Sequence, residues 1–463
     1  MSNQPAPNDH QTPSGQDLRD RVAGIFPDLL HELAELVAIP SVSSDPDHVV
    51  DVAASAEHVR DRFAAAGLSA ECLHGENPDG TPGRPAVVAR TPAVEGAPTV
   101  LLYAHHDVQP TGDVARWTSD PFVAEVRGER IYGRGASDDG AGIIVHLGAL
   151  RALGPDLPVN VVVYIEGEEE VGSPSFRDFV TTHAERLRAD VIVVADSHNW
   201  KVGEPALTTT LRGNCTATVD VKVLGHAVHS GAFGGPVLDA VTLAARLIAT
   251  LHDEAGDVAV RGLGGESTAE VVWPEDEFRA AAGTVAGLRL AGTGDLAARV
   301  WTKPAINVIG FDARPVAQAS NTIAPDARFK LSMRTVPGHD PREDMEALRA
   351  HLEQHVPFGA EVTVTPNEYG PGYRADLTSP VADDLHRSLE EAWGVPAVNI
   401  GVGGSIPFIS DFQEVFPDAQ VVVTGVEDPQ TNAHSEDESQ SVPDLEAAVL
   451  AEALLLVRLG RDD

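Results

Sequence analysis

The sequence predicts an α/β fold whose central, mostly parallel sheet is flanked by helices and interrupted by an inserted ferredoxin-like α+β domain. Three observations favour this class. First, apolar runs typical of doubly buried strands alternate with helical patterns up to residue 211. Second, residues 212–372 contain strands in which apolar and polar residues alternate. Third, the earlier pattern returns from residue 373, and 463 residues are too many for one compact core.

The segment 18–211 supplies the first part of the larger domain. Apolar residues recur at helical spacing in Pro27–Val37 and Asp51–Ala66, which predicts two amphipathic helices. Gly142–Leu153 is almost wholly apolar, so we expect a buried helix there. The strands expected to be buried on both faces are Thr99–Ala104, Val159–Ile165 and Val191–Ala195.

The segment 212–372 is predicted to be the inserted domain. Its first strand, Asn214–Leu224, alternates apolar and polar residues and should therefore have one exposed face. The following elements are a helix at Val237–Leu251, strands at Ile306–Ile309 and Ala327–Arg334, a helix at Pro341–Leu352 and a strand at Glu361–Thr365. The order β-α-β-β-α-β is that of a ferredoxin-like unit. The larger domain resumes over 373–463 and ends in a helix at Asp444–Leu459.

Composition limits the partners and the location of the protein. The formal net charge of -37 repels nucleic acid and anionic membranes, so we expect neither as a partner. Two cysteines, Cys72 and Cys215, cannot form a disulfide framework. No apolar run approaches the ~20 residues that span a bilayer, and residues 1–17 form a polar tail without the features of a signal peptide. These features predict a disordered tail and a cytoplasmic protein.

Acidic residues and histidines gather where the predicted strands end. Asp138 lies in a glycine-rich turn ahead of the buried helix; the others are His105, Asp107, Glu169, Glu170, Asp196 and, after the apolar run 421–424, His434. Open α/β sheets place their sites at this edge. Imidazole and carboxylate groups without cysteine favour a divalent cation. So many ligands predict two cations, since one would leave several carboxylates repelling each other.

Taken singly, these motifs have ordinary structural interpretations. A histidine such as His105 near a strand end often makes only hydrogen bonds. A tight turn followed by Asp138 and Asp139 is often just the start of a helix that these acids cap. The run 166–170 resembles a solvated acidic loop. Several such coincidences at successive strand ends favour a metal site instead.

Local geometry indicates which of these residues bind metal and which support or assist the ligands. Residues two apart on a strand face the same side, so Asp107 is placed to orient the His105 imidazole while His106 points elsewhere. The adjacent Glu169 and Glu170 have different orientations, so that one can bind metal while the other accepts a proton from an activated water. Asp139 is expected to cap the following helix or face away from the site.

Together the motifs resemble the di-zinc metallopeptidase family of aminoacylases, carnosinase-type dipeptidases, succinyl-diaminopimelate desuccinylases and glutamate carboxypeptidases. The resemblance extends over nearly the whole chain after the tail, and it is closest to the cytosolic dipeptidase branch. The segments that carry it are His105–Pro110, Leu211–Gly213, His229–Gly235, Trp301–Asn307, Gly403–Pro407 and Asn432–Ser435.

The resemblance implies two divalent cations per subunit, zinc or alternatively manganese or cobalt. The ligands that it implies are His105, Asp138 and Asp196 for one ion and Asp138, Glu170 and His434 for the other, with Asp138 bridging. It makes Glu169 the general base and Asp107 the residue that orients His105.

The resemblance also gives the inserted domain a role as a lid and dimerisation domain. In a homodimer, His229 would reach the partner subunit's site and stabilise the oxyanion. The residues at positions that hold the C-terminal carboxylate of the substrate are Thr322, Arg334 and Ser405.

Three positions depart from the family pattern. Gly140 stands where relatives commonly have lysine, Gly401 where many dipeptidases have arginine, and Ala104 where glycine is usual. None of these changes removes a metal ligand. The missing arginine at Gly401 bears on substrate preference.

These inferences predict a metal-dependent exopeptidase that hydrolyses dipeptides or similar short amides. A water activated between two cations attacks the peptide carbonyl, and Glu169 takes its proton. The alternatives are an N-acyl amino acid amidohydrolase with the same machinery and a non-catalytic metal-bound binding protein, against which Glu169 argues. A phosphoesterase ranks last, because the sequence has no glycine-rich phosphate cradle or basic cluster.

Overall fold

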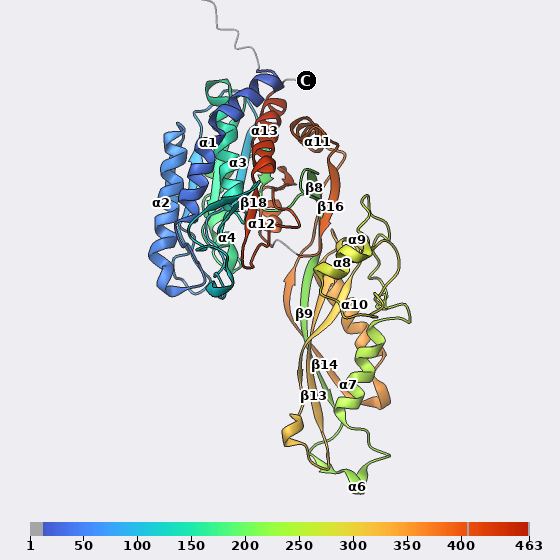
Figure 1. The fold of residues 1–463 in the computed structure, drawn as a ribbon. Helices are drawn as coiled ribbons and strands as arrows, with labels where there is room; N and C mark the ends of the chain where they lie inside the picture. The colour runs from blue at the N-terminus through green and yellow to red at the C-terminus, as the bar shows by residue number, and fades with distance from the viewer. Residues whose placement is uncertain (1–12, 405–406, 462–463) are drawn as a thin grey trace, which may run out of the picture. The chain divides into compact units, whose positions relative to one another are not determined.

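The computed structural model describes residues 13–404 and 407–461, which divide into two compact units. Unit 1 lies within Met1–Thr208, Ala375–Asn399 and Asp411–Asp463. Unit 2 consists of Thr209–Arg374 and Ile400–Ser410. Both units are drawn in Figure 1, where the colour change along the chain shows that unit 1 is built from the two ends of the sequence.

The sheet of unit 1 has the strand order β1-β2-β6-β3-β7-β17-β8. In chain order these strands are β1 (Ser69–Leu73), β2 (Ala86–Arg90), β3 (Thr99–His105), β6 (Asn160–Glu166), β7 (Val191–Val194), β8 (Ala206–Leu211) and β17 (Gln420–Val423). The four central strands β6, β3, β7 and β17 are parallel, and β1, β2 and β8 pair antiparallel. The predicted mostly parallel sheet is confirmed. Two further strands, β15 (Tyr373–Arg374) and β16 (Val398–Val402), pair with β8.

Helices cover this sheet because its central strands are apolar on both faces. The main helices of unit 1 are α1 (Gly15–Val37), α2 (Val49–Ala65), α3 (Gly140–Leu153), α4 (Phe176–Thr182), α5 (Ala184–Leu187), α11 (Pro380–Trp393) and α13 (Val442–Leu459). Helix α3 packs against α1, α13 and β3, and nearly all its residues are buried. The large core of unit 1 therefore lies between the central strands and these helices.

The start of α1 corrects the predicted limit of the tail. The tail was expected to reach residue 17 and the helix to begin at Pro27, but α1 begins at Gly15. Ser14 and Asp17 form a capping box, in which each side chain accepts a hydrogen bond from the backbone N–H of the other. Pro27 lies inside the helix. Residues 1–12 of the predicted tail lie outside the described residues.

Unit 2 has the predicted ferredoxin-like arrangement. Its antiparallel sheet has the order β11-β13-β9-β14. The elements are β9 (Gly213–Lys222), α7 (Ala240–Ile248), β11 (Ala305–Asp312), β13 (Asp326–Thr335), α10 (Pro341–Gln354) and β14 (Glu361–Gly370). In β9 the apolar residues of the alternation are buried, and with α7 and α10 they form the core of this unit.

The remaining elements are short. They are β4 (Glu125–Arg127), β5 (Arg130–Tyr132), β10 (Val228–His229), α6 (Ser230–Phe233), α8 (Glu275–Ala281), α9 (Leu296–Trp301), β12 (Thr322–Ile323), α12 (Pro407–Val415) and β18 (Ser439–Ser441). Strands β18, β5 and β4 form a small sheet in unit 1, and β10 pairs with β12 in unit 2.

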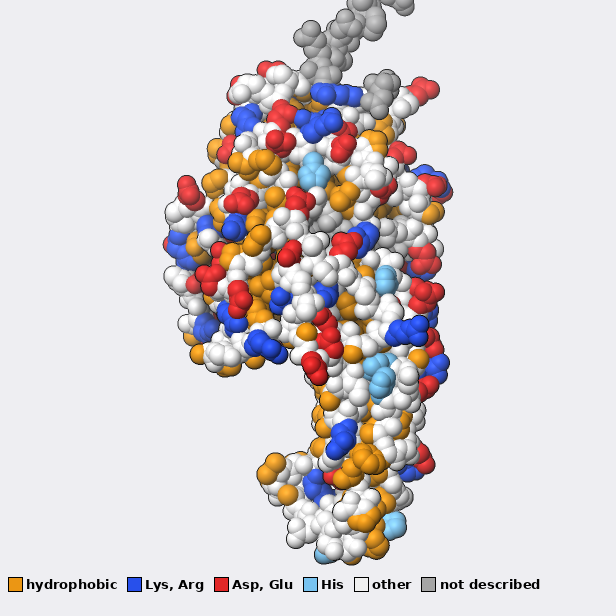
Figure 2. All heavy atoms as spheres, turned by 90° about the vertical axis from the view of Figure 1, so that its right-hand side faces the viewer, with side chains coloured by type: hydrophobic (Ala, Val, Ile, Leu, Met, Phe, Trp, Pro, Cys, Tyr) orange, Lys and Arg blue, Asp and Glu red, His pale blue; other side chains and the backbone are white. Residues whose placement is uncertain are grey.

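The formal net charge of the chain is -37. Figure 2 shows acidic and basic side chains interspersed on the visible face. Within the described ranges, no helix is both long enough and apolar enough to cross a membrane.

Candidate metal centre

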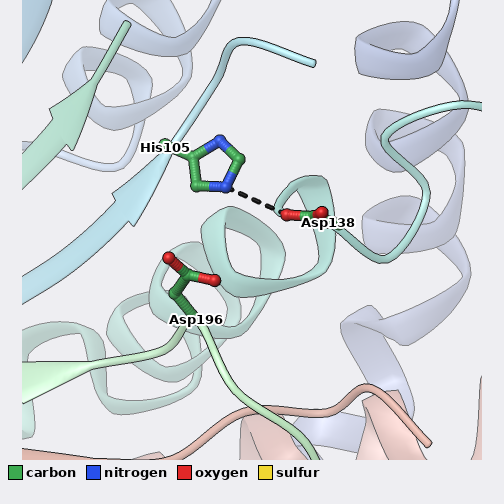
Figure 3. Close-up of side chains that lie close together, drawn as sticks. All are labelled: His105, Asp138 and Asp196. Atoms are coloured by element: carbon green, nitrogen blue, oxygen red, sulfur yellow. Dashed lines mark hydrogen bonds and ion pairs between the residues drawn. The ribbon is translucent and has the colours of Figure 1, made fainter. Parts of the chain in front are cut away.

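The first ligand set consists of His105, Asp138 and Asp196. His105 is the last residue of β3 and fully buried, Asp196 follows β7, and Asp138 lies in the turn before α3. One ligand atom from each residue lies within 4.8 Å of the others. Figure 3 shows the three side chains pointing toward one another, with His105 Nε2 at 3.0 Å from Asp138 Oδ1. The parallel strands bring the residues together because β3 and β7 are neighbours.

The second ligand set consists of Asp138, Glu170 and His434, whose ligand atoms also lie within 4.8 Å of one another. His434 Nε2 is 2.8 Å from Asp138 Oδ2 and 3.3 Å from Glu170 Oε2. The two oxygens of Asp138 therefore face different histidines, Oδ1 toward His105 and Oδ2 toward His434. This geometry is that of a bridging carboxylate between two sites.

The protonation energetics show how crowded the carboxyl groups are. Burial raises the pKa of Glu170 to about 8, and the neighbouring Asp138 adds to the rise. Burial and the nearby Glu169 raise the pKa of Asp196 well above its usual value. Burial alone would raise the pKa of Asp138 as well, but hydrogen bonds with His105 and His434 hold it below its usual value. A hydrogen bond to Asp138 raises the pKa of His434 to about 9.

This donor set fits two divalent cations. Each set offers one imidazole nitrogen and two carboxylate oxygens, which suits zinc, manganese or cobalt. Cations would neutralise the like charges that now raise the pKa of the buried carboxyl groups. Sharing Asp138 would place the two ions close together, as dinuclear sites require.

Asp107 organises the loop that carries the two glutamates. Its carboxylate accepts hydrogen bonds from the backbone N–H groups of Glu169 and Glu170, both at 3.1 Å. His105 Nδ1 lies 3.0 Å from the carbonyl oxygen of Asp107 and 3.5 Å from its Oδ1. The backbone carbonyl is therefore the nearer partner of the imidazole. Glu169 itself is half-buried in the short 3-10 helix Glu169–Val171 that follows β6, and burial raises its pKa.

Two neighbours of the ligands behave as the sequence pattern predicts. Asp139 caps α3, since its Oδ1 accepts a hydrogen bond from the N–H of Gly142 at 3.1 Å. Its Oδ2 also accepts from the backbone N–H of His105 at 3.2 Å, a contact that the sequence does not reveal. His106 turns the other way and bonds the carbonyl oxygen of Pro85 at 2.9 Å.

Sequence reasoning missed three supporting residues of this centre. Gln109 donates a hydrogen bond to Glu170 Oε2 at 2.7 Å. Arg134 and Glu438 form a buried ion pair at 2.6 Å beside Asp138. The sequence did hold one sign of this support. Arg134 stands between two glycines in the turn, where a charged side chain is expected to need an acidic partner.

Three of the substrate-binding candidates, His229, Thr322 and Arg334, lie in unit 2. His229 and Thr322 are paired directly in the β10–β12 ladder, and both are exposed. Arg334 is half-buried on β13. It lies near Arg212, whose pKa falls to about 10 because of burial and of the Arg334 charge. Ser405 lies outside the described residues.

The two glycine departures have steric causes. A Cβ on Gly140 would collide with the carbonyl oxygen of Gly135, so the lysine common in relatives does not fit this backbone. A Cβ on Gly401 would collide with the hydroxyl of Thr210 and the side chain of Trp301. Ala104 is fully buried in β3.

An α/β domain with two cation-ligand sets at its strand ends has the architecture of a dinuclear metallohydrolase. Residues 101–458 match peptidase family M20/M25/M40, and the chain belongs to this family. The predicted family resemblance is confirmed.

Individual relatives agree with the dipeptidase branch. The chain is 34% identical over 446 residues to the cysteinylglycine-S-conjugate dipeptidase of Corynebacterium striatum, covering 94% of this chain and 96% of the relative. It is 28% identical over 410 residues to the Cys-Gly metallodipeptidase of Schizosaccharomyces pombe, covering 82% and 85%. Its fold is similar to that of a di-peptidase from Saccharomyces cerevisiae, with a TM-score of 0.74, 22% identity and coverage of 96% and 98%.

Proposed function

We propose that this protein is a metallodipeptidase that hydrolyses the peptide bond of dipeptides. The observation that carries the proposal is the pair of ligand sets sharing Asp138, with Glu169 beside them. Membership of a peptidase family and the similarity to enzymes named as Cys-Gly dipeptidases support this substrate class.

The proposed chemistry divides between the cations and the protein. When bound by the two ligand sets, divalent cations polarise a carbonyl group and lower the pKa of water. Glu169 accepts the proton of the attacking water and returns it to the amine that leaves. The charges that act on Glu169 include those of His105 and His434, one from each ligand set. This supports a position of Glu169 close to both cation sites. Asp107 accepts a hydrogen bond from the backbone N–H of Glu169 and so limits the motion of this base.

The residues of unit 2 are proposed to bind the substrate. The described part of the chain offers no hydrogen-bond or ion-pair partner to the guanidinium of Arg334, which leaves it available for a carboxylate. Thr322 and Ser405 are proposed to assist at the same end of the substrate. His229 is proposed to stabilise the oxyanion from the partner subunit.

A homodimer and a cytoplasmic location belong to the same proposal. Among the described strands, β11 lies at the edge of the unit 2 sheet, where β13 is its one partner. Residues 307–312 of this strand are exposed, including Ile309 (54% exposed) and Phe311 (39%). An exposed apolar edge favours pairing with another strand, and the same strand of a second copy would extend the sheet by symmetry. The absence of paired cysteines supports the cytoplasmic assignment, since Cys72 and Cys215 are both free thiols.

A substrate panel tests the proposal. Purified protein supplied with zinc or manganese is assayed on dipeptides, including Cys-Gly, and on the N-acetyl and N-succinyl derivatives of the same C-terminal amino acids. We expect kcat/KM to be higher for the dipeptides. Higher values for the N-acyl compounds would identify an amidohydrolase instead, and no hydrolysis of either class would favour a binding protein.

A further inference from the structure

The carboxylate of Glu438 is saturated with hydrogen bonds. It is completely buried in unit 1 and accepts from Arg134 Nη1 at 2.6 Å. It also accepts from the backbone N–H groups of Gly135 and Ser137 at 3.0 Å and of Asp138 at 3.1 Å. Four donors match the lone-pair capacity of one carboxylate. The turn that presents the bridging ligand is thus wrapped around this single side chain.

Arg134 also links the turn before α3 to two other segments by hydrogen bonds. Its Nη2 donates to the carbonyl oxygens of Pro110 and Ser435, both at 3.1 Å. Pro110 belongs to the loop after β3, and Ser435 directly follows His434. The buried Arg134–Glu438 pair therefore cross-links three segments that carry metal ligands or their supports.

The loop of His434 depends on such external support. Asn432, His434 and Asp437 all have positive φ angles, of 56°, 61° and 57°. Residues other than glycine rarely adopt this conformation, which persists only where surrounding contacts hold it. Asp437 and Glu438 end this loop, so the ion pair lies where the loop rejoins the fold.

We propose that Arg134 and Glu438 are positioning residues that set the geometry of the second cation site, and that this site depends on them more than the first. The reason for the asymmetry is that His434 belongs only to the second set. His105 is held independently, by the ladder of β3 and by the bond from its N–H to Asp139. This inference rests on the proposed metal centre.

Two substitutions separate charge from geometry. Arg134→Lys keeps a positive charge for Glu438, but an ammonium group lacks the planar fork that reaches the carboxylate and both carbonyl oxygens. Glu438→Gln keeps the size of the side chain and replaces one acceptor oxygen with a donor. Glu32→Gln is the matched control, because it breaks the Arg151–Glu32 ion pair (2.7 Å) between α3 and α1 of the same unit.

Calorimetric titration of chelator-treated full-length protein with Zn²⁺ measures both sites without relying on activity. For the wild type and Glu32→Gln we expect two ions per chain. In Arg134→Lys and Glu438→Gln the second ion should bind about 10–100-fold more weakly, as when a support of a metal ligand is lost. Binding of the first ion should weaken less than that of the second, because only one of its ligands, Asp138, lies on the turn that Glu438 holds. Far-ultraviolet circular dichroism identifies a variant that fails to fold, and the other variant then decides.

The outcomes are distinguishable. Fewer than two ions on the wild type would contradict the proposed metal centre itself. Two ions on the wild type with unchanged or equally weakened sites in the folded variants would contradict only the positioning role of Arg134 and Glu438.

Discussion

The carboxylate of Asp107 accepts a hydrogen bond from the backbone N–H of Glu169 at 3.1 Å. Asp107 lies two residues after His105 in the chain. One short segment after β3 thus supplies a candidate metal ligand and also fixes the position of the proposed base. This coupling makes the loop of Glu169 part of the metal centre rather than an independent acidic loop.

Glu169→Gln should retain metal and substrate binding but lose turnover. The amide keeps the shape of the side chain and cannot accept the proton, and loss of a general base costs about 10²–10⁴-fold in kcat. Steady-state kinetics and metal analysis measure the two effects separately. The matched variant Glu170→Gln should instead lose bound metal, because Glu170 belongs to a ligand set. Near-normal turnover in Glu169→Gln would mean that another residue is the base.

Removal of metal should abolish hydrolysis. Neither ligand set contains a serine, threonine or cysteine side chain that could attack the carbonyl in place of an activated water. Dialysis against a chelator, followed by assay and elemental analysis, should give inactive protein that regains activity with zinc, manganese or cobalt. Full activity of a preparation shown to contain no metal would refute the mechanism.

His229→Ala should lower kcat about 10²–10³-fold, the usual effect of losing an oxyanion donor, with both metals retained. His226→Ala is the control, since this exposed histidine lies three residues before His229 in the chain. If His229 acts across a homodimer, mixing His229→Ala with Glu169→Gln restores about a quarter of wild-type activity, because half of the dimers contain one intact composite site. No recovery despite demonstrated subunit exchange, or a fully active monomer, would disprove the shared site.

The buried His146–Glu452 pair should make stability depend on pH. His146 Nδ1 lies 2.8 Å from Glu452 Oε2, and its Nε2 lies 3.0 Å from the Tyr103 carbonyl oxygen. Burial alone would lower the pKa of His146, but the Glu452 charge raises it above its usual value. A raised pKa contributes stability that is complete below the unfolded value of about 6.5 and is lost as pH rises through the folded value.

Glu452→Gln should therefore lower the free energy of unfolding more at pH 6 than at pH 9. Breaking a buried pair costs about 3–5 kcal/mol, and this applies to the lower pH. Urea denaturation at the two pH values measures the difference. Glu446→Gln on the same helix serves as control. An equal loss at both pH values would show that His146 is not charged at pH 6.

The fold was predictable where burial imposes a simple pattern. Strands β3, β6 and β7 are apolar on both faces because helices cover both sides, and this leaves an uninterrupted run in the sequence. The start of α1 was not predictable in the same way, because Ser14 and Asp17 act through local capping bonds in a polar segment.

The site was predictable to the extent that its residues follow strands. His105 and Asp196 come together because β3 and β7 are adjacent and parallel. Glu438 could not be found in this way. Three of its partners are backbone N–H groups, which leave no trace in side-chain identity. Roles in unit 2 such as that of His229 rest on the family resemblance and stay predictions.

The position of β17 has a consequence for how the chain matures. This strand lies between β7 and β8, pairing Val423 with Val194 on one side and with Thr208 on the other. During translation β7 and β8 leave the ribosome before β9 to β14, and β17, the strand that joins β7 to β8, follows all of these. Until then the bare edge of β7 is open to strands of other chains. We therefore expect a chain truncated before β17 to aggregate more readily than the full chain.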